Sequence, residues 1–193
     1  FGWYRALCSA RRCAMRFVQR DRRGNPIEAL CPVIVCGLVI DADMVKTDSA
    51  RAHVSKALSA FVSVLKHDRD AAKIVRFVAQ HDLANASKVP SGFSSVHALR
   101  LGLCSKDASP LTSADADCAC LQMEQTVDFY TSKGTEVRGA VLVILTQNCT
   151  IETSVRGRVK VLSLSSDDEG ASVPFFERSA QYILSCMGEG LLS

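Results

Sequence analysis

The stretch from Cys31 to Lys66, CPVIVCGLVIDADMVKTDSARAHVSKALSAFVSVLK, decides the fold. It begins with an unbroken apolar run over residues 33–40, which has the length and β-branched content of a buried strand. It continues with apolar side chains at helical spacing, at Ala50, Val54, Ala57, Leu58, Phe61, Val62 and Leu65. Thr47, Asp48 or Ser49 can cap this helix through a short oxygen side chain. The stretch therefore predicts a buried strand that leads into a long amphipathic helix.

Three more helices are expected after residue 66. The polar run at residues 67–70 breaks the first helix, and a second amphipathic pattern follows at Ala71, Ile74, Val75 and Val78. We expect these two helices to form an antiparallel hairpin. A third helix is predicted over residues 113–132 and is closed by Gly134, and a last one starts at Ser172 and ends at Gly188.

The remaining apolar segments predict strands. Residues 93–103 alternate in part, and residues 140–145 form a run that predicts a strand buried on both faces. Turns at residues 147–148 and at Gly157 favour strands over 149–155 and 159–164, in an antiparallel meander. This element order predicts an α+β or irregular α/β fold, with a mixed sheet of about four to five strands covered by about four helices.

Composition indicates one globular domain. With 193 residues and 48% hydrophobic content, the chain can bury a core without the support of disulfides or a structural metal. We assign the domain to residues 25–193. No apolar run has the length of a transmembrane segment. The nine cysteines are odd in number and fit no zinc spacing, which favours reduced thiols in a reducing compartment. The chain also has no phosphate-binding glycine loop, so we expect no metal and no cofactor.

Residues 1–24 form a basic N-terminal arm. It has a net charge of +6, whereas the rest of the chain has a net charge of −3. Its composition resembles that of a mitochondrial transit peptide. Arginine binds phosphate in a bidentate manner, so the arm can anchor the protein to structured RNA, to an acidic protein surface or to lipid headgroups. The candidate RNA- or partner-binding residues are Arg5, Arg11, Arg12, Arg16, Arg20, Arg22 and Arg23.

Two strand ends suggest an enzymatic alternative. The first strand runs into Asp41-Ala42-Asp43, and the strand over residues 140–145 ends at Thr146. This pair resembles the first two motifs of the haloacid dehalogenase-like phosphatases. The resemblance implies that Asp41 is the nucleophile, that Asp43 is the general acid and base, and that Thr146 holds the phosphoryl group. The family also uses a lysine and a further acidic magnesium motif, and the short stretch after Thr146 fits a hairpin better than two more strand–helix units.

The sequence favours a non-catalytic role over this alternative. We expect a structural subunit of a large intracellular assembly, held by the arm and contacting other subunits through its folded body. The specific hypothesis is an organellar ribonucleoprotein in the mitochondrion, with residues 1–24 on structured RNA. The alternatives are a subunit of a protein-only mitochondrial complex and a divergent magnesium-dependent phosphatase that uses Asp41 and Asp43. If the basic arm binds no partner, we expect it to form a solvated amphipathic helix that packs against the folded body of the same chain.

Overall fold

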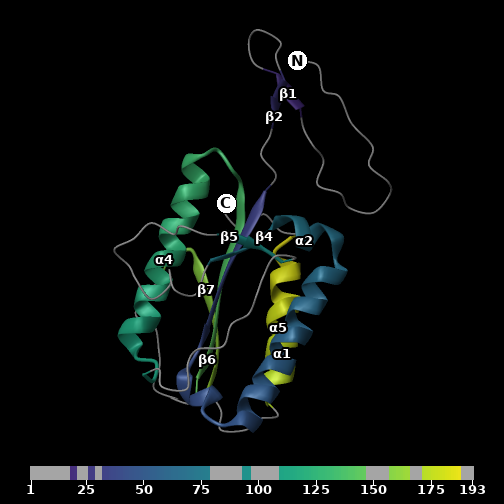
Figure 1. Cartoon of the computed structure of the whole chain (residues 1–193). Helices are drawn as coiled ribbons and strands as arrows, with labels where there is room; N and C mark the ends of the chain where they lie inside the picture. The colour runs from purple at the N-terminus through teal and green to yellow at the C-terminus, as the bar shows by residue number, and fades with distance from the viewer. Residues whose placement is uncertain are drawn as a thin grey trace.

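A mixed five-stranded sheet forms the centre of the protein (Figure 1). The computed structural model of the chain describes residues 18–20, 26–28, 32–78, 93–96, 109–146, 157–165 and 171–187. The sheet has the order β5-β4-β3-β6-β7, in which β5 is antiparallel to β4 and the other neighbours are parallel. Its strands are β3 (Val33–Ile40), β4 (Val75–Val78), β5 (Phe93–Ser95), β6 (Val137–Thr146) and β7 (Val159–Ser165).

Helices cover both faces of this sheet. One face carries α1 (Asp48–His67), α2 (Arg69–Ile74) and α5 (Ser172–Ser185), and the other carries α4 (Ser113–Ser132) (Figure 1). A short 3-10 helix, η1 (Ala42–Val45), joins β3 to α1. The expected mixed sheet with four helices is confirmed. Among the described residues, no helix is both long and apolar enough to cross a membrane.

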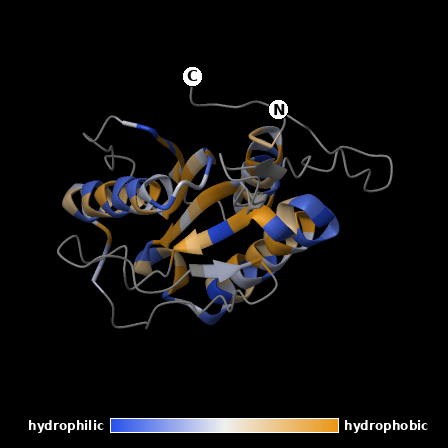
Figure 2. Ribbon diagram, turned by 90° about the horizontal axis from the view of Figure 1, so that it is seen from above, coloured by the Kyte–Doolittle hydropathy of each residue, from blue (hydrophilic) through white to orange (hydrophobic). Residues whose placement is uncertain are grey.

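The central strand β3 sends side chains into two separate cores. Ile34, Cys36, Leu38 and Ile40 pack under α1 and α5, whereas Val33, Val35 and Val39 pack under α4. All eight residues of β3 are buried, as the unbroken apolar run predicts for a strand covered on both faces. Figure 2 shows the sheet mostly in hydrophobic colours between helices whose outer sides are largely hydrophilic.

The segment after α1 differs from the prediction. The expected second helix stops at Ile74, and Val75–Val78 form strand β4 beside β3, so the predicted helical hairpin is wrong. Val75 and Phe77 point to the α1 side, and Val78 points to the α4 side. The same residues fit a helical stripe, but pairing with β3 buries both faces of this β-branched and aromatic run.

Strand β7 also differs from the prediction, because it is the direct neighbour of β6 in the sheet. The register pairs Ala140 with Val159 and Thr146 with Ser165, whereas the predicted antiparallel meander would place the strand over residues 149–155 between these two strands, so the meander is wrong here. Parallel neighbours need a crossover rather than a tight turn. The strand expected over residues 149–155 lies outside the described residues.

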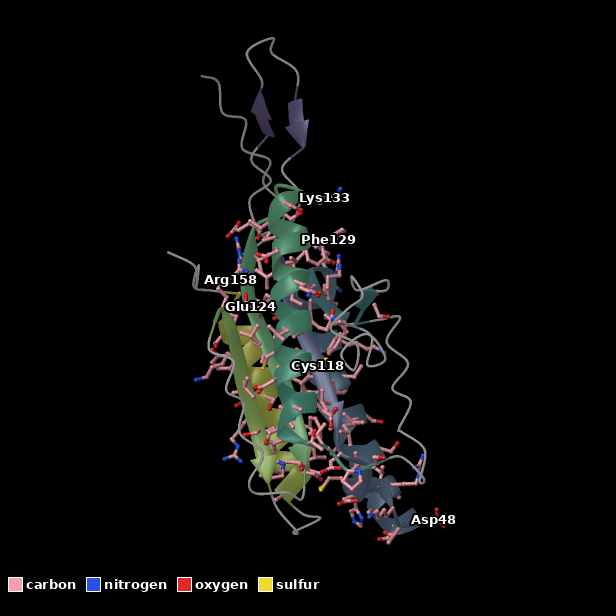
Figure 3. The ribbon with its side chains drawn as sticks, turned by 90° about the vertical axis from the view of Figure 1, so that its left-hand side faces the viewer. Asp48, Cys118, Glu124, Phe129, Lys133 and Arg158 are labelled. Atoms are coloured by element: carbon pink, nitrogen blue, oxygen red, sulfur yellow. The ribbon has the colours of Figure 1, made fainter. Side chains whose placement is uncertain are left out.

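A charged clamp holds the start of β7 against α4. The Arg158 guanidinium donates to Glu124 at 3.0 Å and to Asp128 at 2.6 Å, and the Arg158 backbone N–H donates to Glu124 at 2.6 Å. Figure 3 shows Arg158 and Glu124 together on this side. Hydrogen bonds to Asp128 and Glu124 raise the pKa of Arg158. The clamp ties the edge of the sheet to the helix that covers it.

The N-terminal arm lies mostly outside the described residues. Its described part is β1 (Val18–Arg20), which pairs antiparallel with β2 (Pro26–Glu28) in a separate two-stranded sheet. These two strands come from opposite sides of the boundary that we placed after residue 24. Residues 18–20 form a strand, so the alternative of a helical arm is wrong over these residues.

The described cysteines are free thiols, and most of them fill the core. Cys36, Cys120 and Cys186 are buried, and Cys118 is half-buried. Burial raises the pKa of the Cys36 thiol, so this side chain stays protonated and acts as a small apolar group.

Gly37 is where β3 has no room for a side chain. A Cβ atom there would lie 2.8 Å from Met123 Sδ and 2.9 Å from Leu142 Cδ1. We expect Gly37→Ala to lower the free energy of unfolding by about 1–3 kcal/mol, because the extra methyl overpacks the α4 side of the core. Urea denaturation measures this change.

Met123→Ala tests the cause, since it removes the side chain that the new methyl group meets. If overpacking is the mechanism, the double variant loses less stability than the two single variants together. Strictly additive losses would show that the strain at Gly37 lies elsewhere.

Candidate functional site

The candidate site lies at the carboxyl edge of the sheet, between β3 and β6. The chain passes from β3 to β4 on one side, and β6 lies on the other side of β3. In open α/β sheets the crevice at such a reversal of strand order is the usual place for a ligand. Asp41 directly follows β3, and Thr146 ends β6, so the topology places both residues there.

Asp41 is buried and its carboxylate is held from three directions. Its exposed fraction is 1%. Oδ2 accepts a hydrogen bond of 2.6 Å from the Thr146 hydroxyl, and Oδ1 accepts one of 3.0 Å from the Leu111 backbone N–H. Oδ1 also accepts from the Asp43 backbone N–H at 3.3 Å, which caps η1. One side chain thus joins the end of β3, the end of β6 and the segment that leads into α4.

Asp43 is half-buried and faces a lysine of its own segment. Lys46 Nζ lies 2.6 Å from Asp43 Oδ1, and the Lys46 side chain is mostly exposed. This pair has the i,i+3 spacing of one helical turn, across η1. The negative charge of Asp43 is therefore compensated within the same short segment.

Two helix starts at this edge, those of α1 and α4, are capped by side chains of the chain itself. Thr47 caps α1 through a hydrogen bond to the Ala50 N–H, and Asp48 lies in the first helical turn. Thr112 and Asp115 form a complete capping box at the start of α4. Helix N-termini often bind phosphate, but at the starts of α1 and α4 a threonine hydroxyl already accepts from a backbone N–H, and an acidic residue lies in the first turn.

The structure brings together the residues that the resemblance implied, but it does not leave them open. Asp41 and Thr146 are in contact, and Asp43 lies beside them through its backbone. Among the described residues, no three His, Cys, Asp or Glu side chains gather at a place that could hold a metal ion. Asp167 and Asp168, the acidic pair that follows Thr146 after about twenty residues, lie outside the described residues.

The arginines of the other candidate site are not described, apart from the backbone of Arg20 on β1. Sequence reasoning also missed two interaction partners of the aspartates at the carboxyl edge, namely Lys46 for Asp43 and the Leu111 N–H for Asp41. The ion pair of Lys46 could have been predicted from the sequence, because Lys46 lies one helical turn after Asp43. The hydrogen bond of the Leu111 N–H could not, because a backbone donor 70 positions away carries no side-chain pattern.

Comparisons with protein-family models, with curated proteins and with solved structures found no match to this chain.

We expect Thr146→Val to lower the free energy of unfolding by about 1–3 kcal/mol, because it leaves a buried carboxylate oxygen without its hydroxyl donor. Thr146→Ser is the matched control, since it keeps the hydroxyl and loses one methyl group. Urea denaturation of the three proteins measures both changes. A valine variant as stable as the parent would show that the Asp41 carboxylate is not held by this hydrogen bond.

Proposed function

We propose that this protein is a non-catalytic subunit of a larger intracellular assembly, and that the assembly is a mitochondrial ribonucleoprotein. The observation that carries the proposal is that the Asp41 carboxylate is engaged in hydrogen bonds within the fold. At the edge where this topology would bind a substrate, its carboxylate is buried and accepts hydrogen bonds on both oxygens. The side chain is used to hold the fold together.

A nucleophilic role for Asp41 conflicts with these contacts. A carboxylate that attacks phosphorus needs one oxygen facing the substrate. Here Oδ2 faces Thr146, and Oδ1 faces Leu111 and the start of η1. Attack would first require the loss of hydrogen bonds that tie two strands and a helix together. A body with this edge closed is suited to contact partners through its outer surface.

The basic arm supplies the attachment in this proposal. Its seven arginines and single acidic residue give a strong positive charge within 24 residues. Guanidinium groups form bidentate contacts with phosphate, and Trp3, Tyr4 and Phe17 lie among the arginines, where they can stack on bases. The transit-peptide-like composition supports a mitochondrial location.

Native purification tests this proposal. The full chain with a C-terminal tag is isolated at moderate salt, with and without ribonuclease, and its size is measured. We expect co-migration with a large particle that ribonuclease dissolves, because the arm is held by RNA phosphates. A variant lacking residues 1–24 is the control and is expected to leave the particle.

Two outcomes contradict the ribonucleoprotein. A particle that survives ribonuclease and raised salt would identify a protein-only complex. A single species of the monomer mass of 20.9 kDa would contradict membership of any stable assembly.

The second candidate is the magnesium-dependent phosphatase. The observation that favours it is the 2.6 Å contact between Asp41 and Thr146 at the ends of adjacent parallel strands. This is the juxtaposition that the resemblance implies for the nucleophile and the phosphoryl-binding hydroxyl. The described residues contain no cluster of acidic side chains that could hold magnesium, so the further acidic residues of that family would have to come from outside them.

A phosphatase assay separates the two candidates. We expect no magnesium-dependent hydrolysis of p-nitrophenyl phosphate above the buffer blank, because the Asp41 oxygens are engaged. The matched control is Asp41→Asn, checked for folding by circular dichroism. Hydrolysis by the parent protein that disappears in a folded Asp41→Asn variant would establish the enzyme and overturn the non-catalytic proposal.

A further inference from the structure

Strand β7 is the outer edge of the five-stranded sheet. The order of strands ends with β7, and β6 is its neighbour on the inner side. In the part of the chain that the structure describes, no strand lies on the outer side of β7. An edge strand points a row of backbone N–H and C=O groups away from the sheet, where a further strand can pair with them.

β7 lacks most of the features that keep an edge strand from pairing. Natural edge strands are short, are interrupted by a bulge or a proline, or carry charges. The opposite edge, β5, follows this rule with three residues, two of which are serines. β7 has seven residues and no proline, pairs with β6 without a shift in register, and has one charged residue, Lys160.

Apolar side chains border this edge on both faces of the sheet. Leu162 and Leu164 lie on the side of α1 and α5, whereas Val159 and Val161 lie on the side of α4. All four side chains are only half-buried. A strand that paired with β7 would remove more of their apolar surface from water.

Leu121 extends this apolar border onto α4. Among the described residues it is the one large apolar side chain that is exposed, with an exposed fraction of 46%. Glu124 and Asp128 follow it at helical spacing, and both bind Arg158 just before β7, so Leu121 is on the side of α4 that borders β7 (Figure 3). A single exposed leucine is common on protein surfaces, but this one lies next to an open strand edge.

The charges at this edge favour an apolar strand as the partner. Arg158 is bound by two carboxylates, so these three groups have a net charge of −1, which the positive charge of Lys160 offsets. Neither a polyanion nor a polycation therefore meets a complementary charge here. The complementary surface is a nearly neutral strand edge with apolar side chains on both faces, and β7 itself has these properties.

Two copies of β7 can pair about a two-fold axis perpendicular to the sheet. This symmetry makes the strands antiparallel and keeps each face of the sheet on the same side. With the axis at Leu162, Lys160 lies opposite Leu164 of the second copy, and its aliphatic stem can cover that leucine. The two Lys160 residues are then four positions apart along the strands, or about 14 Å, which exceeds the Debye length of about 8 Å in physiological salt. Their repulsion is therefore weak.

We propose that β7 is a self-association edge, through which two copies of this chain pair in antiparallel orientation and join their sheets into one. Leu121, Leu162 and Leu164 lose exposed surface in this interface. The inference goes beyond the proposed function and does not depend on it, because neither RNA nor the arm takes part.

Sedimentation velocity of the full chain tests this proposal. The protein is treated with ribonuclease, so that bound nucleic acid does not contribute, and is studied at moderate salt over a range of concentrations. The test variant is Leu121→Lys/Ser163→Lys, because both positions are exposed and border the interface. The matched control, Ala52→Lys/Ser59→Lys, adds the same two charges to the exposed side of α1. Circular dichroism checks that all three proteins are folded.

We expect the parent protein and the control to form a dimer of twice the monomer mass of 20.9 kDa. The dissociation constant of the dimer should increase by about tenfold or more in the test variant, because its lysines meet those of the second copy across the interface. Hydrogen exchange locates the contact. The backbone amides of residues 159–165 should exchange more slowly as the parent protein is concentrated, and this protection should be lost in the test variant.

Several results overturn the inference. A parent protein that stays monomeric would exclude self-association, and a dimer that the test variant leaves unchanged would lie at another surface. Slow exchange of residues 159–165 at every concentration would show that the edge is covered within a single chain. Protection that appears only in a native particle would assign the edge to a different subunit. The ribonucleoprotein proposal stands in each case, because it is tested by ribonuclease and by deletion of residues 1–24.

Discussion

Burial of both faces of β3 is the constraint on which the other elements depend. Its seven apolar side chains alternate between two cores, so helices must cover the sheet on both sides. α1 and α5 seal one side, and α4 seals the other. Gly37 shows how closely the second layer approaches, because Met123 occupies the space in which a side chain would lie. A central strand of this kind also needs a neighbour on each edge, and β4 and β6 provide them.

The parts of the fold that local pattern determines were predictable, and those that depend on distant pairing were not. The bounds of β3 and α4 follow from apolar runs, caps and the positive φ of Gly134. Val75 to Val78 fit a helical stripe and a strand equally well, and only contact with β3 decides between them. The place of β7 next to β6 likewise depends on strand pairing, and no local sequence pattern indicates it.

The candidate site follows the same division. That Asp41 and Thr146 meet was predictable, because strands of a parallel sheet end at one edge. The sequence could not show that both Asp41 oxygens are engaged. The donor to Oδ1 is the backbone N–H of Leu111, which is far away in the chain. Buried hydrogen-bonded carboxylates can serve structure or chemistry, and the two roles differ in whether an oxygen is left for a ligand. At Asp41 both oxygens are engaged.

The two ends of the sheet differ in charge for a reason built into the topology. Helices that connect parallel strands run opposite to them, so helix N-termini gather at the carboxyl edge and C-termini at the amino edge. Acidic caps stabilise the first ends and basic side chains stabilise the second. Asp48 and Asp115 follow this rule, as do Lys66 and Lys133.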